Sequence, residues 1–393
     1  MQLSDVYLDN SATTALSPAA KERMLAAMEL YGNPSSLHTY GVEAQRLVRE
    51  ARAEILSSLG VRSTSGGALI FTGSGTEATN LALLGTAHAK ARRQSGTVVI
   101  TDSEHPSVEN TARALEKEGF RILRVPTKGG VLDEEFLDRA LNRDVFLVSL
   151  MLVNNETGAR YAVEKAFRLA KMRNPDVITH CDAVQGYLKC RFTAQSLGAD
   201  LITLSAHKIH GPKGVGALYV DKRILTKRAL VPTVHGGGQE DGLRSGTENV
   251  IGIAGFVAAA RAAAASLDAD IARLSALRSY AIEHLSPLEL RLNLPVGETA
   301  PHIVNLTLPD IRSETMLHFL SSKGIYVSAG SACSSHDAHP SSALLAFGLS
   351  AEETGYSIRI SLADTNTEED LDRLVSALDE GIRTLVRTKR LKR

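Results

Sequence analysis

One lysine lies where a reactive amine would be useful. Lys208 belongs to the run SAHKIHGPKG, residues 205–214, which follows an apolar stretch that predicts a buried strand. A lysine in the Gly/Pro-rich turn after such a strand presents its amine at the carboxyl edge of a sheet, where it can form a Schiff base with an aldehyde. Lysine in a loop is more often simply solvated, so Lys208 alone does not decide the chemistry.

A carboxylate and a glycine-containing loop precede this lysine. The run HCDAVQ, residues 180–185, places Asp182 at the end of another apolar stretch. A buried carboxylate needs a partner, and the protonated ring nitrogen of a cofactor is a suitable one, although Asp182 could instead cap the next helix. The run TGSGTE, residues 72–77, opens onto a predicted helix whose first N–H groups would bind phosphate. Many strand–helix turns have a similar composition.

Cys333 is the third reactive residue. It lies among small residues in SAGSACSS, residues 328–335, a composition that suits a mobile loop able to reach a cofactor and then swing outward. A free cysteine is more often inert and buried, but the polar, glycine-bearing surroundings favour exposure. We expect Cys181 and Cys190 to be structural. Three cysteines at these spacings indicate neither a disulfide framework nor a zinc site, and we predict no metal.

The segments that position these residues alternate between strand and helix. Helical patterns, such as 76–92 and 106–118, separate seven β-rich runs between residues 68 and 220. The runs are ALIFT, TVVITD, RILRVP, VFLVSLML, VITHCDA, LITLSA and GALYV. This alternation predicts an α/β fold with a mostly parallel sheet, in which ligands collect at the carboxyl ends of the strands.

The second part of the chain has a different organisation. An alanine-rich stretch, 251–285, predicts one or two long helices. Shorter runs follow, HIVNLTL, GIYVSAG and SIRISLA, together with helices near 314–323 and from Glu368 onward. We therefore expect a large domain, residues 15–255, and a smaller α+β domain built from residues 1–14 and 256–393.

The composition and charge of the chain limit the kinds of molecule that it is expected to bind. The 393 residues contain 44 Lys and Arg and 44 Asp and Glu, so there is no charge footprint for nucleic acid or an anionic membrane. The first residues lack a signal-peptide pattern, and the apolar run 251–265 looks too short and too interrupted to span a bilayer. With few cysteines, a cytoplasmic protein without direct nucleic-acid or membrane binding is the simplest expectation.

In this order, the motifs resemble those of the class V aminotransferase superfamily of fold-type I pyridoxal-phosphate enzymes. More narrowly, they are similar to the cysteine desulfurases of the nitrogen-fixation and iron–sulfur-cluster type. The resemblance runs nearly end to end, through YLDNSATT, YGNPSSLH, EHPSVENT, VNNETG, HCDAVQ, SAHKIHGPKG, HGGGQEDGLRSGTEN, SAGSACSS and SIRISL. It implies a homodimer with pyridoxal 5'-phosphate as cofactor, a seven-stranded, mostly parallel sheet in the large domain, and a smaller α+β domain.

The resemblance also implies a role for each matching residue. Lys208 would be the Schiff-base lysine, Asp182 would pair with the pyridine nitrogen, and Gln185 would bond the ring's phenolic oxygen. His105 would stack on the ring and act as an acid–base partner, since its ordinary pKa lies near neutrality. The phosphate site would comprise Gly75, Thr76, Ser205, His207 and, from a second subunit, Thr247. The substrate site would comprise Asn155, Asn33 and Arg359, the last two gripping the carboxylate.

The implied reaction converts L-cysteine to L-alanine. Lys208 would remove the α-proton, and Cys333, as a thiolate, would attack the substrate sulfur. The sulfur would remain on Cys333 as a persulfide for delivery to an acceptor protein, such as an iron–sulfur scaffold or a thiolation factor.

Three departures from the family pattern keep alternatives open. The phosphate loop has Gly-Ser-Gly where relatives usually have Ser-Gly followed by Ala or Gly, and His336 and His339 follow the cysteine where relatives often have Gly or Ala. Ala363 and Asp364 stand where relatives tend to have Gly-Arg. A negative charge near Arg359 could weaken carboxylate binding. The alternatives are a selenocysteine lyase, a class V aminotransferase that would not need Cys333, or a degenerate scaffold paralogue.

Overall fold

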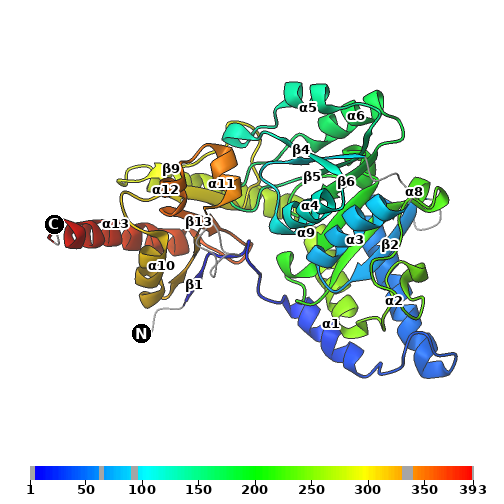
Figure 1. Cartoon of the computed structure of the whole chain (residues 1–393). Coiled ribbons are helices and arrows are strands. Elements are labelled where there is room, and N and C mark those ends of the chain that lie inside the picture. Colours follow the sequence, from blue (N-terminus) through cyan, green and yellow to red (C-terminus); the bar gives the residue numbers. More distant parts are fainter. Residues whose placement is uncertain (1–4, 62–65, 90–95, 330–339, 392–393) are drawn as a thin grey trace.

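A computed structural model describes residues 5–61, 66–89, 96–329 and 340–391, with no side-chain detail from 386 onward. A larger part of the molecule is organised around one central sheet, and both chain ends lie in a smaller part beside it (Figure 1). The candidate site lies where these two parts meet.

The central sheet has seven strands in the order β2-β8-β7-β6-β5-β3-β4. Its strands are β2 (Gly67–Thr72), β3 (Thr97–Thr101), β4 (Arg121–Val125), β5 (Val145–Met151), β6 (Ile178–Asp182), β7 (Leu201–Ser205) and β8 (Gly216–Asp221). Neighbours from β4 to β7 pair in parallel, while β8 is antiparallel to both β7 and β2. The seven predicted strands and the predicted mostly parallel α/β sheet are therefore confirmed.

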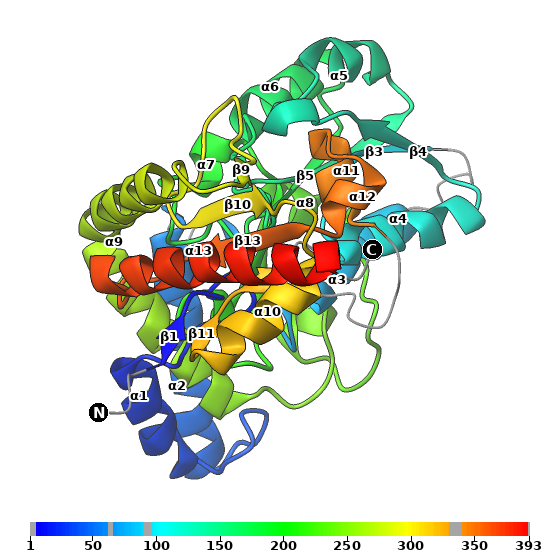
Figure 2. The same cartoon turned by 90° about the vertical axis from the view of Figure 1, so that its left-hand side faces the viewer.

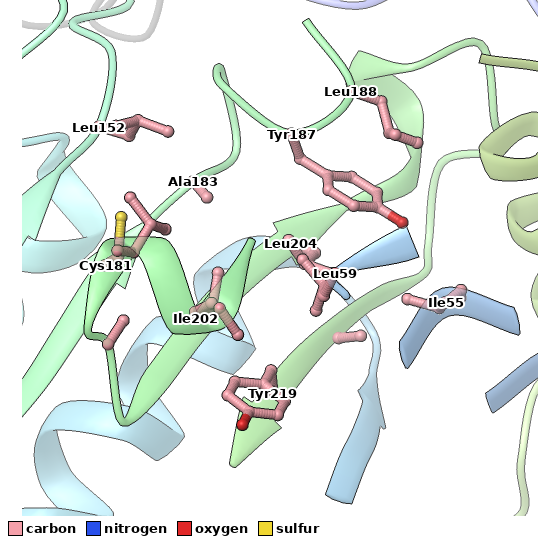
Figure 3. Packing of buried hydrophobic residues seen from close by; sticks show 14 of the residues in the cluster. Ile55, Leu59, Leu152, Cys181, Ala183, Tyr187, Leu188, Ile202, Leu204 and Tyr219 are labelled. Atoms are coloured by element: carbon pink, nitrogen blue, oxygen red, sulfur yellow. The ribbon is translucent and has the colours of Figure 1, made fainter. Parts of the chain in front are cut away.

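Helices cover both faces of this sheet because alternate residues of most strands pack to opposite sides. On one face, Ile70 and Leu218 pack with α3 (Gly75–His88) and α4 (Pro106–Lys117). On the other, strand residues pack with α2 (Thr39–Ser58) and α6 (Val163–Arg173). Figure 3 shows part of this second core, with side chains from β6, β7 and α2. The predicted helix over 76–92 ends earlier, at His88, and its last three residues lie outside the described part of the chain.

A single long helix, α9 (Val250–Leu285), joins the two parts. Phe256 belongs to the core of the large sheet, whereas Leu277 belongs to the core of the small part. The predicted boundary between 255 and 256 falls inside this helix, and the exact domain limits stay a prediction.

By length and composition, α9 could cross a membrane, so the expectation that this stretch is too short was wrong. Half of its most apolar window is buried within the protein, packed partly against α1 (Pro18–Met28) and α2.

The small part combines two sheets with helices. One sheet has the order β12-β13-β10-β9, and the other pairs β1 with β11 in parallel. The strands are β1 (Val6–Tyr7), β9 (Arg291–Leu292), β10 (Ile303–Thr307), β11 (Ile325–Tyr326), β12 (Ser328–Ala329) and β13 (Ser357–Ser361). The helices are α10 (Ser313–Ser322), α11 (Ser342–Phe347), α12 (Ala351–Thr354) and α13 (Glu368–Leu391). Figure 2 shows α13 lying across this part beside α10. The remaining short helices, α5 (Glu134–Ala140), α7 (Ala194–Leu197) and α8 (Lys222–Thr226), belong to the large part.

Candidate active site

A cavity of about 560 Å³ lies at the carboxyl ends of β5, β6 and β7. Most of the predicted site residues line it. They are Gly75, Thr76, His105, Asn155, Asp182, Gln185, Ser205, His207, Lys208 and Arg359. Their meeting follows from the topology, because adjacent parallel strands end at the same edge of a sheet. Their individual roles stay predictions.

Lys208 is held by the N-terminal segment of the chain. It lies in a short 3-10 turn, η2 (Ala206–Lys208), directly after β7. Its Nζ donates to the backbone oxygens of Ser11 at 2.6 Å and Ala12 at 2.8 Å. Both of these partners are backbone carbonyl oxygens of the N-terminal segment, which therefore positions the amine at the cavity.

Asp182 ends β6 and is 7% exposed. Its Oδ1 accepts a hydrogen bond from the backbone N–H of Val184 at 3.0 Å, which closes a turn. The next helix, α7, is capped by Thr193, so the alternative role of Asp182 as a helix cap is not found. Burial raises the pKa of this carboxyl to about 6, against the opposing effects of that hydrogen bond and of Lys208. At neutral pH, Asp182 is thus ionised in a pocket that disfavours a lone charge, which suits a cationic ring nitrogen.

The first turn of α3, at Gly75 and Thr76, has the geometry of an anion-binding site, here called the anion cradle. Ser74 caps the helix by accepting from the N–H of Glu77 at 3.1 Å, which leaves the first-turn N–H groups of Gly75 and Thr76 without helix partners. A Cβ on Gly75 would lie 3.1 Å from Cγ2 of Val184 and 3.3 Å from Cβ of Ser205. Only glycine fits easily there, so the backbone can approach a phosphate closely.

His105 differs from its predicted behaviour. It is the N-cap of α4, and its Nδ1 accepts from the N–H of Ser107 at 3.1 Å. Burial, and then the positive charge of Lys208, lower the pKa of this imidazole to about 4. His105 therefore lines the cavity as a neutral ring at pH 7, and the acid–base role inferred from its ordinary pKa stays a prediction.

Arg359 and Gln185 have unused atoms in the cavity wall. Arg359, 2% exposed on β13, donates to Asp9 Oδ1 at 2.8 Å and to the backbone oxygen of Asn155 at 3.0 Å. Within the described residues, its Nε is buried without a partner, as is Oε1 of Gln185. Gln185 Nε2 donates to the Ser11 oxygen at 2.9 Å. These unpartnered atoms, with the anion cradle and Lys208, fit a phosphate-bearing aldehyde and a carboxylate substrate.

Two predicted residues, Asn33 and Thr247, do not line this cavity. Asn33 is exposed, and its Oδ1 accepts from the N–H of Ser35 at 2.9 Å, so its role in substrate binding stays a prediction. Thr247 is exposed in the loop before α9. Cys333 lies outside the described residues, as do the histidines 336 and 339.

Two acidic residues of the cavity wall were not predicted. Burial is the main cause that raises the pKa of Glu104 to about 8 and that of Glu156 to about 7. Glu156 Oε2 accepts from the hydroxyl of Ser341 at 2.6 Å. Both lie in motifs used above, EHPSVENT and VNNETG, but their burial depends on long-range packing that the local sequence does not encode.

Asp364 lies on a different cavity from Arg359. It lines a second cavity of about 680 Å³, where its Oδ1 lies 3.4 Å from Nε2 of His210. The acidic partner of Arg359 is Asp9 instead. The expected interference of Asp364 with the substrate arginine is therefore not found, because Asp364 pairs with His210 in the second cavity, whereas Arg359 lines the first.

Cys181 and Cys190 are both buried, as expected for structural residues. Burial raises the pKa of each thiol, well above its usual value for Cys181 and to about 11 for Cys190. Neither is suited to act as a thiolate at neutral pH.

Comparison with known proteins agrees with this geometry. Residues 6–374 match the aminotransferase class-V family. The chain is 38% identical to "Cysteine desulfurase IscS" of Dictyoglomus turgidum, covering 97% of this chain and 95% of the relative. It is 37% identical to "Cysteine desulfurase IscS 1" of Archaeoglobus fulgidus, covering 96% and 97%.

Solved structures give the same result. A NifS-like protein superposes with a TM-score of 0.88 at 36% identity, covering 96% of this chain and 98% of that one. The structure "SspA in complex with cysteine" has a TM-score of 0.76 at 30% identity, covering 92% and 99%. The pocket, the full-length sequence match and the structural similarity together place this chain in the aminotransferase class-V family.

Proposed function

We propose that this protein is a pyridoxal-phosphate-dependent cysteine desulfurase. The observation that carries the proposal is the convergence of Lys208, Asp182, the α3 N-terminus and Arg359 on one cavity, in a chain related along its whole length to proteins named cysteine desulfurases. The intact cavity disfavours a scaffold paralogue, which has no use for these side chains.

The cofactor, when bound, supplies an electron sink for the carbon from which a proton is removed. Lys208 would hold its aldehyde, and Asp182 would hold its ring nitrogen. Gln185 would bond its phenolic oxygen by donating from Nε2, which here donates to the Ser11 oxygen. The cradle of Gly75 and Thr76, with Ser205 and His207, would hold its phosphate.

The substrate would be oriented by Arg359, whose guanidinium can form paired hydrogen bonds with a carboxylate. Asp9 and the backbone oxygen of Asn155 fix that guanidinium from behind. Once displaced from the cofactor, the Lys208 amine is the base that takes the α-proton. The neutral His105 ring would stack over the cofactor rather than carry a stable charge.

Sulfur transfer needs a thiolate, and Cys333 is proposed to supply it. Its sulfur attacks the substrate sulfur, forming an S–S bond while the carbon–sulfur bond breaks. The bonding pair goes to the carbon fragment, which takes up one proton at the β-carbon, regains the α-proton and leaves as alanine. The persulfide left on Cys333 would then pass its outer sulfur to an acceptor protein.

The test measures alanine and sulfide released from L-cysteine with a reductant present. We expect the wild-type protein to make both, Cys333→Ala to make neither while keeping the cofactor absorbance, and Lys208→Ala to lose covalently held cofactor. Undiminished consumption of L-cysteine by Cys333→Ala, without release of sulfide, would favour an aminotransferase instead. Release of selenide from L-selenocysteine, with L-cysteine ignored, would favour a selenocysteine lyase.

We also propose a homodimer in which Thr247 completes the neighbouring phosphate site. Thr247 is exposed and outside its own cavity. In addition, a group of large apolar side chains is exposed at the corner between α1 and α2: Leu25, Met28, Tyr31, Leu37, Tyr40 and Val42. An apolar group of this kind is typical of a protein interface.

Mixed dimers test this arrangement. Each variant alone, Thr247→Ala or Lys208→Ala, should have low activity. The two variants are unfolded, mixed and refolded together. If Thr247 acts across the interface, each mixed dimer has one complete site, and part of the activity returns. No recovery on mixing, with dimers present, would show that Thr247 serves its own chain or none.

A further inference from the structure

The two carboxylate oxygens of Glu104 lie in unlike surroundings. The residue is 4% exposed, lies between β3 and α4, and belongs to the cavity wall. Its Oε1 accepts from Oγ1 of Thr101 at 2.8 Å, from the N–H of Thr101 at 3.4 Å and from the N–H of Met151 at 3.0 Å. Its Oε2 is buried and has no partner within the described residues. One oxygen thus resembles a well-bonded carbonyl, and the other a hydroxyl.

Strand register brings this carboxyl close to Asp182. Met151, which donates to Glu104, is the residue paired with Asp182 across β5 and β6. Paired residues on neighbouring strands lie roughly 5 Å apart. Two buried carboxylates this close repel each other, so one of them holds its proton more tightly.

We propose that Glu104 is a positioning residue that keeps its proton at neutral pH, which leaves Asp182 as the charged member of the pair. Lys208 stabilises the ionised form of Asp182. Burial, and then the charge of Asp182, raise the pKa of Glu104 to about 8, against the hydrogen bonds from Thr101 and Met151.

The other titratable groups around Glu104 do not reverse this assignment. They come from each element packed against it: His105 from α4, Tyr161 from the segment before α6, Cys181 from β6 and Lys208 from η2. The lowered pKa of His105 and the raised pKa values of Tyr161 and Cys181 keep these three neutral near pH 7. The cation of Lys208 acts on Asp182. A single negative charge therefore faces the ring nitrogen of the proposed cofactor.

The first test compares the thermal stability of the full-length wild-type protein, with no cofactor added, with that of Glu104→Gln from pH 5 to 9. A carboxyl with a pKa of about 8 when folded and 4.5 when unfolded is protonated only in the folded state between these values. Its contribution to stability is full below pH 4.5 and is lost as the pH rises to 8. We expect the Tm of Glu104→Gln to rise steadily relative to wild type over this range and to level off above pH 8.

The matched control is Glu135→Gln, at a glutamate whose side chain is 89% exposed. The difference in Tm between this variant and wild type should not change with pH. A flat difference for Glu104→Gln as well would overturn the proposal, since Glu104 would then be ionised throughout. An infrared band of a protonated carboxyl, present in wild type at pH 7 and missing in Glu104→Gln, would support it independently.

The second test concerns cofactor binding and rests on the proposed function, whereas the stability test does not. Glutamine matches the shape and the donor of a protonated carboxyl. Glu104→Gln should therefore bind pyridoxal phosphate at pH 7 within twofold of wild type, and Glu104→Ala at least tenfold more weakly. A tenfold loss in Glu104→Gln, or its failure to fold, would overturn the proposal. If wild type binds no cofactor, the proposed function fails while the stability result still decides the protonation of Glu104.

Discussion

At the scale of single residues, the pocket separates charged groups from neutral ones. Asp182 and Arg359 are the buried charges placed to hold opposite ends of a bound cofactor and substrate, while His105 and His207 both have a pKa lowered to about 4, chiefly by burial. The two imidazoles are therefore neutral near pH 7 and can contribute packing and hydrogen bonds. The groups of the pocket that change charge near neutral pH are carboxyls.

Cofactor binding should weaken in acid because of Asp182. As the pH falls below about 6, this carboxyl takes up a proton and loses its charge, so the Kd of the apoenzyme for the cofactor should rise by up to about tenfold per pH unit. Asp182→Asn should bind roughly 10- to 100-fold more weakly at pH 7, as expected for a lost charged hydrogen bond. It should also lose the acid dependence, measured by titration of cofactor absorbance.

The control is Asp102→Asn, because Asp102 bonds Thr127 and does not line the cavity. It should keep the wild-type pH dependence. An Asp182→Asn variant with an unchanged acid dependence would assign the titration to another group.

Substrate binding should depend on the shape of Arg359 and not only on its charge. Lys at this position keeps the charge but cannot form the paired bonds of a guanidinium. We expect Arg359→Lys to lower kcat/KM for L-cysteine roughly 10- to 100-fold, mainly through KM, with normal cofactor absorbance. Arg291→Lys, on a half-exposed arginine of β9, should leave both unchanged. An unchanged KM in Arg359→Lys would remove this residue from the substrate site.

At the scale of elements, the start of α3 combines a helix cap with an anion cradle. Ser74→Ala should cost about 1 kcal/mol of stability through loss of the cap, and it should also weaken cofactor binding because the first turn lines the cavity. Asp133→Ala removes an equivalent cap from α5, away from the cavity. It should cost similar stability, measured by urea unfolding, without changing the Kd for the cofactor. Equal effects of both variants on cofactor binding would contradict a specific role for α3.

The sequence predicted the strands and helices better than the contacts between residues of different elements. Apolar runs were enough to place Lys208 and Asp182 at strand ends, because strand direction follows from the alternation of strands and helices. Glu104 was missed because its burial depends on Met151 from another strand. The misplaced concern about Asp364 has the same cause: proximity in sequence to Arg359 suggested contact, but Arg359 on β13 lines the first cavity, whereas Asp364, beyond β13, lines the second. The lowered pKa of His105 could not be predicted from sequence, since only the folded pocket supplies the desolvation.

At the scale of the whole molecule, the contact between His210 and Asp364 links the lysine turn to the small part. Asp364 is half-exposed, and such pairs are worth little, about 0–1 kcal/mol. We expect Asp364→Asn to change the stability by less than about 1 kcal/mol and the KM for L-cysteine by less than about twofold, since its pair does not include Arg359. A large increase in KM would show that the charge of Asp364 reaches the substrate site.

The support of Lys208 by Ser11 and Ala12 also bears on the order in which the chain acquires its site during synthesis. This segment precedes the large sheet in the chain, yet Val6 pairs with Ile325, and Asn10 bonds the backbone of Ser361. Contacts across such long separations close slowly in folding. The large sheet can therefore assemble on a partial chain, whereas the carbonyls that hold the lysine amine reach their places only after residues 325 and 361 have been synthesised. A nascent chain that lacks these residues would thus have no active lysine site.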